Sequence, residues 1–281
     1  MIRLIDVKKV YDNGTEALKG ISFTIEDGDF VFLVGPSGSG KSTIIKLLTG
    51  EIVPTAGRVM VNGFSMGRIS DKQIPYMRRT IGVIFQDFRL ITGKTVRENL
   101  SLAMCAVGAG PREIKNRIPY VLELVGLKGK EGSFPDQLSG GEQQRVAIAS
   151  VLTMQPEILA LDEPTSNLDP ISTERIFQVI AQLNREMGTT VLLVEHEIEL
   201  LAQYATRILV VHDGAILLDG TPQEVFSRRD IFDSIGLEVP QVTQIAACAG
   251  EEYGLWTGEP LPITMEQLCR RIRGDESGNE D

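Results

Sequence analysis

The stretch Gly35-Pro36-Ser37-Gly38-Ser39-Gly40-Lys41-Ser42 decides how the rest of the chain is interpreted. It fits the pattern G-x-x-x-x-G-K-[ST] and stands between an apolar run, residues 29–34, and a helix-like run, residues 42–48. Between a strand and a helix, such a loop turns backbone N–H groups toward phosphate oxygens, and the helix N-terminus adds partial positive charge. Lys41 can reach the outer phosphates, and the Ser42 hydroxyl can hold Mg²⁺. The stretch therefore predicts a nucleotide phosphate site in an α/β fold.

Composition restricts the class of protein further. The chain has 281 residues, 42% of them hydrophobic and 23% charged, which is typical of a globular chain of one or two domains. Its net charge of −10 argues against a nucleic-acid coat. We see no apolar run long enough to cross a membrane, no signal-peptide pattern in the first ten residues, and no CxxC pair among the three cysteines. These features predict a globular protein of a reducing compartment.

Apolar runs on both sides of the phosphate loop predict strands of two kinds. Residues 3–10 and 17–25 are strand-like and are joined through Asn13-Gly14, which favours an antiparallel hairpin. Residues 158–161 and 191–194 are unbroken apolar runs, typical of parallel strands that are covered on both faces. Together with the strand, loop and helix of the phosphate site, they predict an α/β fold with a mixed sheet and an antiparallel β part.

A mostly helical region is expected over residues 90–153. Thr95 and Glu98 have the spacing of a capping box at the start of one helix. Pro119 falls inside the next helical pattern, where it predicts a kink or an interruption. The helical region thus separates the phosphate loop from the apolar runs that follow.

Two adjacent carboxylates follow the run at residues 158–161. Asp162 and Glu163 would stand at the C-terminal end of that strand, where ligands bind in open α/β sheets. Successive strand residues point to opposite faces, so Asp162 can serve Mg²⁺ while Glu163 addresses an attacking water. An acidic pair at a strand end is common by itself, but beside a phosphate loop it predicts nucleotide hydrolysis.

A second glycine-rich segment precedes another helix. Ser139, Gly140 and Gly141 stand before a helix expected to begin near Glu142, which makes a second anion site from backbone N–H groups. A simple helix cap is the plainer interpretation of these three residues. With the phosphate loop and the acidic pair, however, the segment closely resembles the signature of ATP-binding cassette ATPases. The resemblance extends over about residues 2–226.

The resemblance implies roles for further residues at matching positions. Tyr11 matches the aromatic residue that stacks on adenine, Gln86 matches the glutamine that touches Mg²⁺, and His196 matches the switch histidine that contacts the γ-phosphate. Asp169 matches the loop between two active sites. The implied set comprises the catalytic residues Glu163, His196 and Gln86, the metal ligands Ser42, Gln86 and Asp162, and the ATP-binding residues Tyr11, Gly35, Pro36, Ser37, Gly38, Ser39, Gly40, Lys41, Ser42, Thr43, Ser139, Gly140, Gly141 and Asp169.

The resemblance also implies an assembly. ATP would be sandwiched between the phosphate loop of one cassette and the signature of another, with ATP and Mg²⁺ as cofactors. This chain carries one cassette, so it must pair with a second copy or with a paralogue. A membrane transporter subunit would be contacted near Gln86, through residues 86–91, which places the protein at the cytoplasmic face of the cell membrane. No nucleic-acid partner is expected.

Two segments of the chain indicate two different subtypes of cassette ATPase. Gly236-Leu237-Glu238-Val239-Pro240-Gln241-Val242 resembles the ATPase subunits of energy-coupling factor transporters, the importers of vitamins and of nickel or cobalt ions. By contrast, Asp87-Phe88-Arg89-Leu90 resembles cell-division and lipoprotein-export cassette ATPases, which form the alternative. Soluble cassette proteins of repair or translation usually carry two cassettes or long coiled-coil insertions, and this chain has neither.

The expected domain plan follows from these motifs. We expect a nucleotide-binding domain over residues 2–235, with its helical subdomain at about 90–153. Residues 236–273 would form a C-terminal extension that could serve in dimerisation. Residues 274–281 carry four acidic residues and no basic one, which predicts a disordered tail.

Overall fold

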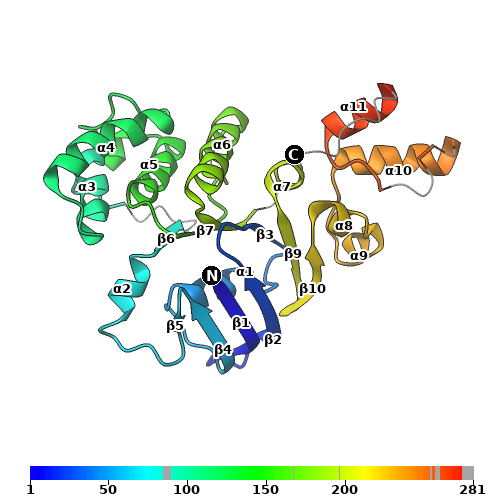
Figure 1. The fold of residues 1–281 in the computed structure, drawn as a ribbon, viewed down its shortest axis with the longest axis horizontal. Helices are drawn as coiled ribbons and strands as arrows, with labels where there is room; N and C mark the ends of the chain where they lie inside the picture. The colour runs from blue at the N-terminus through cyan, green and yellow to red at the C-terminus, as the bar shows by residue number, and fades with distance from the viewer. Residues whose placement is uncertain (85–89, 167, 196, 254, 257–259, 274–281) are drawn as a thin grey trace.

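The computed structural model describes residues 1–84, 90–166, 168–195, 197–253, 255–256 and 260–273. Two sheets form its centre (Figure 1). The antiparallel sheet has the order β2-β1-β4-β5, and the larger sheet has the order β10-β9-β3-β8-β7-β6, with β10 antiparallel to β9 and the other strands parallel. The bounds are β1 Ile2–Val10, β2 Glu16–Ile25, β3 Phe30–Val34, β4 Ala56–Val61, β5 Phe64–Ser65, β6 Ile81–Ile84, β7 Ile158–Asp162, β8 Thr190–Val194, β9 Arg207–His212 and β10 Ala215–Gly220. The predicted α/β fold with a mixed sheet and an antiparallel part is confirmed.

Strand β3 is buried on both faces and separates two hydrophobic cores. Phe30 and Phe32 belong to one core, and Val31 and Leu33 belong to the other. The second core contains α1 (Lys41–Leu48), which therefore lies between the larger sheet and the antiparallel sheet. Alternate residues of one strand thus fasten the segment before the phosphate loop to both layers.

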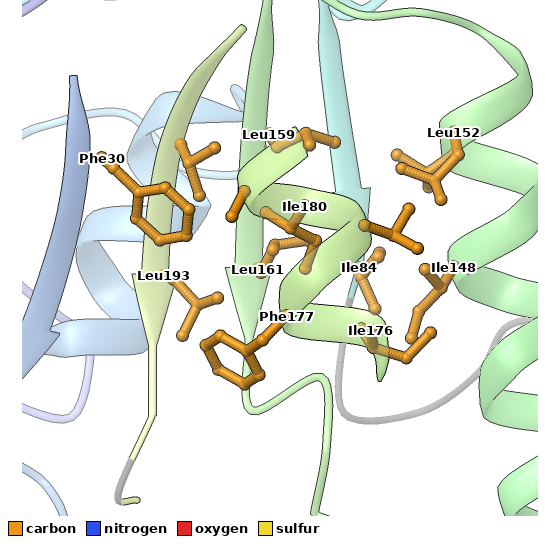
Figure 2. Packing of buried hydrophobic residues seen from close by; sticks show 14 of the residues in the cluster. Phe30, Ile84, Ile148, Leu152, Leu159, Leu161, Ile176, Phe177, Ile180 and Leu193 are labelled. Atoms are coloured by element: carbon orange, nitrogen blue, oxygen red, sulfur yellow. The ribbon is translucent and has the colours of Figure 1, made fainter. Parts of the chain in front are cut away.

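The opposite face of the larger sheet is covered by α6 (Pro170–Met187). Figure 2 shows Phe177 and Ile180 of this helix lying against Leu161 and Leu193 of the sheet. Gly188 ends the helix with a φ of 67°, a left-handed conformation that suits glycine at this position.

The helical region of residues 90–153 contains α3 (Val96–Ala106), α4 (Pro111–Leu124) and α5 (Gly140–Thr153), which gather on one side of α6 (Figure 1). The predicted capping box of Thr95 and Glu98 is present at the start of α3. Of the predicted kink or interruption at Pro119, the interruption is wrong, because α4 runs through Pro119 without a break. Buried contacts of Ile118, Val121 and Leu122 on this helix outweigh the backbone hydrogen bond that the proline lacks.

The chain beyond β8 adds short helices and a small separate core. They are α7 (Ile198–Tyr204), α8 (Pro222–Phe226), α9 (Arg229–Ser234), α10 (Gln241–Tyr253) and α11 (Met265–Arg273), while α2 (Ile74–Arg78) lies before β6. Val242 and Ala246 of α10 pack against Leu268 of α11. The predicted acidic tail lies outside the described residues. No helix in the described part of the chain has the length and apolar character that crossing a membrane requires.

Candidate functional site

The sheet order brings the phosphate loop and the acidic pair to one edge. Strand β8 lies between β3 and β7, and all three run parallel. Val194, the last residue of β8, is paired with Leu33 on one side and with Asp162 on the other. The carboxyl ends of parallel strands meet at the same edge of a sheet, so residues far apart in the sequence share one site.

The phosphate loop is packed so closely that glycine is required at two positions. A Cβ atom at Gly35 would come within 2.0 Å of the Val211 carbonyl oxygen on β9. A Cβ atom at Gly40, where φ is 112°, would come within 2.7 Å of the Ala17 carbonyl oxygen on β2. The turn between β9 and β10 adds a hydrogen bond, because the Gly214 N–H donates to the Ser39 carbonyl at 3.1 Å. The loop is therefore shaped by both sheets.

Lys41 lies inside this loop, with only 6% of its surface exposed. Its Nζ donates to the carbonyl oxygens of Gly35 at 2.6 Å and Pro36 at 2.9 Å. Burial lowers the pKa of Lys41, and the nearby carboxylates of Glu163 and Asp162 oppose that shift. The buried Ser39 hydroxyl has no hydrogen-bond partner among the described residues. A buried cation beside an unsatisfied hydroxyl suits a phosphate group.

Asp162 and Ser42 lie together next to this loop. Burial raises the pKa of Asp162, and a hydrogen bond from the Ser42 hydroxyl is the largest effect that opposes the rise. A hydroxyl beside one carboxylate suits Mg²⁺, which in phosphate sites takes only one or two carboxylates together with substrate oxygens. The described residues contain no group of three or more His, Cys, Asp or Glu that could hold a metal ion.

Glu163 has an unusual backbone conformation for its residue type. Its φ is 49°, in the left-handed region, and its N–H donates to the Val194 carbonyl at 2.9 Å. Left-handed conformations of residues other than glycine cluster at functional sites. The turn starts directly after β7, so Glu163 leaves the strand beside Asp162.

Ser139 caps α5 and stands on the surface. Its hydroxyl accepts from the Glu142 N–H at 3.3 Å, and its own N–H donates to the Glu142 carboxylate at 2.9 Å, which completes a capping box. Ser139 and Gly140 are exposed. Helix α5 lies within the helical region, whereas α1 lies beneath the larger sheet (Figure 1). The signature segment and the phosphate loop of one chain are therefore separate surfaces.

The remaining predicted residues are placed as follows. The Tyr11 hydroxyl lies 3.2 Å from the Thr43 hydroxyl on α1, which puts its ring beside the phosphate loop. Asp169 caps α6 by accepting from the Ser172 N–H at 3.0 Å and from the Ser172 hydroxyl at 2.6 Å. Gln86 and His196 lie outside the described residues.

Glu195 is a site neighbour that sequence reasoning missed. Only 4% of its surface is exposed, and its carboxylate accepts hydrogen bonds from the N–H of Thr165, at 3.3 Å, and from the Thr165 hydroxyl. The loop that follows Glu163 is thereby held to the end of β8. The only indication of Glu195 in the sequence is that a charged residue directly follows an unbroken apolar run. That pattern does not predict Thr165 as its hydrogen-bond partner.

Comparisons with known proteins agree with this geometry. The family model described as ABC transporter matches residues 18–166. The chain is 46% identical over 219 residues to the cell division ATP-binding protein FtsE of Bacillus subtilis, covering 78% of this chain and 96% of that protein. It is 36% identical over 256 residues to the energy-coupling factor transporter ATP-binding protein EcfA of Methanocaldococcus jannaschii, covering 89% of this chain and 91% of that protein.

Solved structures give the same result. A dimeric ATP-binding cassette in a post-hydrolysis state, bound to ADP and Pi, aligns with a TM-score of 0.74 at 35% identity, over 79% of this chain and 98% of that one. The cbiO1 protein of Clostridium perfringens, part of the ABC transporter complex cbiONQ, aligns with a TM-score of 0.73 at 30% identity, over 87% of this chain and 97% of that one. The chain belongs to the ABC transporter family. It is an ATP-binding cassette subunit with ATPase activity.

Proposed function

We propose that this chain is the ATPase subunit of an energy-coupling factor importer for vitamins or transition-metal ions. Its C-terminal extension carries the proposal, because the alignment with the EcfA relative reaches 89% of the chain while that with the FtsE relative reaches 78%. The extension is also fastened to the cassette, since the Gln223 side chain on α8 donates to the Leu261 carbonyl. In this proposal residues 2–235 form the cassette and residues 236–273 help two ATPases to pair.

The proposed mechanism assigns each site residue a step. The loop from Gly35 to Ser42 and the Lys41 ammonium bind the outer phosphates, and Tyr11 stacks on adenine. Ser42, Gln86 and Asp162 would hold Mg²⁺, which neutralises phosphate charge. Glu163 takes a proton from the attacking water, while His196 contacts the γ-phosphate.

Pairing of two cassettes completes the site in this proposal. Ser139 and Gly140 are exposed at the start of α5, Gly141 is half-buried, and all three lie away from the phosphate loop of the same chain. Ser139, Gly140, Gly141 and the Asp169 loop of one cassette would therefore close over ATP bound to the other. A second copy of this chain or a paralogue can supply them. A membrane subunit that contacts residues 86–91 would place the pair at the cytoplasmic face of the cell membrane.

A cell-division ATPase is the second candidate. The 46% identity to the FtsE relative favours it, as does the segment Asp87-Phe88-Arg89-Leu90. In that case the same ATP cycle would act on a septal or export-type membrane protein. The two candidates share the cassette chemistry and differ in the membrane protein that binds near Gln86.

Co-purification from mild detergent separates the two candidates. Phe88→Ala should weaken capture of the membrane subunit and leave basal ATPase unchanged, because truncating an aromatic anchor typically costs about 2 kcal/mol or more. Tyr120→Ala, an exposed aromatic on α4, is the matched control. A captured membrane subunit with a vitamin- or metal-binding partner supports the importer, whereas a septal or export-type protein supports the alternative. Loss of basal ATPase and early melting of Phe88→Ala would contradict its role in partner binding.

A further inference from the structure

The loop between α4 and α5, residues 127–138, is fixed to the first turn of α3. Two N–H groups of that turn donate to the loop, Val96 to the Ser133 carbonyl and Arg97 to the Glu131 carbonyl, each at 2.9 Å. The Arg97 guanidinium also donates to the Glu131 carboxylate at 2.5 Å. The first N–H groups of a helix have no partner within the helix, so the loop satisfies donors that α3 leaves open.

The same loop reaches the signature through Lys130. Its Nζ lies 3.0 Å from one carboxylate oxygen of Glu142, on the first turn of α5. The other oxygen accepts from the Ser139 N–H at 2.9 Å and lies 3.1 Å from the Ser139 hydroxyl oxygen. One carboxylate thus connects the cation on the loop to the signature serine. Hydrogen bonding from the Ser139 N–H, followed by that from Lys130, lowers the pKa of Glu142.

We infer that Lys130 is a positioning residue for the signature serine. By fixing one oxygen of Glu142, it holds the other oxygen toward Ser139 and so sets the direction of the Ser139 hydroxyl on the exposed surface. The inference rests on the proposed function, in which Ser139 faces ATP bound to a second cassette. Lys130 therefore acts on a site that it does not touch.

The connection continues toward the segment that follows Gln86. The buried side chain of Asn99, on α3, accepts from the Ile91 N–H at 2.9 Å and donates to the carbonyls of Ile91, Lys94 and Thr95 at 3.2, 3.1 and 3.0 Å. Residues 91–95, α3 and the loop are thereby joined by hydrogen bonds up to Glu142. In the proposed function a membrane subunit contacts residues 86–91, so Ile91 is the point at which this chain of contacts meets the partner.

Removal of the Lys130 side chain tests the inference. It should weaken dimerisation of the cassettes and leave ATP binding by the monomer unchanged. In the Glu163→Gln background, Lys130→Ala should weaken ATP-driven dimerisation by about threefold to fivefold, the range that a partly exposed ion pair can supply. Lys130→Arg should restore it, because a guanidinium can also bind the Glu142 carboxylate. Analytical ultracentrifugation with and without MgATP gives the dimer dissociation constant, and a fluorescent ATP analogue gives the affinity of the monomer.

Lys128→Ala is the matched control. Lys128 stands in the same loop and pairs at 2.6 Å with Glu123, which belongs to α4 and not to the signature helix. We expect all variants to share the melting temperature and the monomer affinity of the parent. Equal dimerisation of Lys130→Ala and Lys128→Ala would overturn the inference, as would a loss of monomer affinity in Lys130→Ala.

Ser139→Arg, measured in the same dimerisation assay, distinguishes failure of the Lys130 role from failure of the proposed pairing through the signature. If Ser139→Arg blocks dimerisation and Lys130→Ala does not change it, the pairing stands and the positioning role of Lys130 fails. If Ser139→Arg itself leaves dimerisation intact, the proposed pairing through the signature fails.

Discussion

The phosphate loop and the signature segment are both rich in glycine and serine and both lead into a helix, yet their surroundings differ. The phosphate loop is enclosed by β2, β9 and the turn at Gly214, and its lysine is buried. The signature is exposed at Ser139, and a capping box with Glu142 fixes its shape. The same local motif therefore serves as an enclosed binding site in one place and as an open surface in the other. In the proposed function, that open surface meets ATP bound to a second cassette.

The largest effect is expected at the enclosed site. Glu163→Gln should keep ATP binding and lower the hydrolysis rate by about 10²- to 10⁴-fold, because the amide keeps the size of the side chain but cannot take a proton from water. The variant should accumulate as an ATP-bound dimer on size-exclusion chromatography. Glu123→Gln, at an exposed position on α4, is the control. Undiminished phosphate release by Glu163→Gln would remove Glu163 from the catalytic role.

Paired alanine substitutions at glycine compare the two segments directly. Gly35→Ala should abolish ATP binding and destabilise the fold by about 1–3 kcal/mol, because its Cβ would lie 2.0 Å from the Val211 carbonyl oxygen. At Gly140, no described heavy atom beyond its chain neighbours and the backbone of its own helix lies within 4 Å of an added Cβ, so Gly140→Ala should leave stability and monomer binding unchanged. Thermal melts measure the stability of the two variants, and titration with a fluorescent ATP analogue measures their ATP affinity. Equal effects at the two positions would contradict the difference in enclosure.

Ser139→Arg tests the open surface by itself. It should leave ATP affinity of the monomer intact and block ATP-driven dimerisation, because the added side chain occupies the surface that a second cassette would meet. Sedimentation with MgATP in the Glu163→Gln background measures the effect. A large loss of affinity in the monomer would argue against two separate surfaces.

The smallest expected effect is a difference in pH response between the phosphate-loop site, at Asp162, and the signature segment, at Glu142. Burial raises the pKa of Asp162 at the enclosed site, whereas the capping hydrogen bonds lower that of Glu142 at the open surface. The stability that Glu142 contributes is therefore complete above the usual pKa of 4.5 and is lost as the pH falls through its lowered value. Burial raises the pKa of Asp162 above its usual 3.8, so this side chain, a Mg²⁺ ligand in the proposed function, begins to take up a proton at a higher pH than a free aspartate does.

In the proposed function, we therefore expect Mg²⁺-dependent ATP affinity to weaken as Asp162 is protonated, and the cap of α5 to weaken as the pH falls through the lowered pKa of Glu142. Affinity measured with and without Mg²⁺ between pH 7 and pH 4, beside helix content by circular dichroism, follows the two events separately. Asp162→Asn should remove the first event and leave the second. A Mg²⁺-dependent affinity that stays constant over this range would contradict the raised pKa of Asp162.

The sequence predicted those elements whose signals are local. The phosphate loop, the capping box of Thr95 and Glu98, and the double-sided strands β7 and β8 follow from patterns within a few residues. Strand β6 escaped prediction because Gly82 interrupts its short apolar run. The structure gives the reason for that glycine, since a Cβ there would come within 2.3 Å of Val151 on α5. Helix α10 was missed because it is rich in small residues, and it is held by contacts with α11.

The residues of the candidate site also differ in whether the sequence could predict them. Lys41, Ser42, Asp162 and Ser139 could be named from motifs, because each stands at a fixed offset within a short sequence pattern. The contact between Glu195 and Thr165 depends on how two loops meet across the end of the sheet, and no pattern in the sequence specifies it.

The enclosure of the phosphate loop also sets an order of events during translation. Val211 and Gly214, which close the loop from one side, are made long after Gly35 and Ser39 have left the ribosome. Strand β3 likewise cannot pair along its two edges until β8 and β9 have been synthesised. Contacts between residues distant in sequence form late in folding. A nascent chain that ends before residue 214 therefore lacks a finished nucleotide pocket, and ATP capture reports that the whole sheet has been synthesised and assembled.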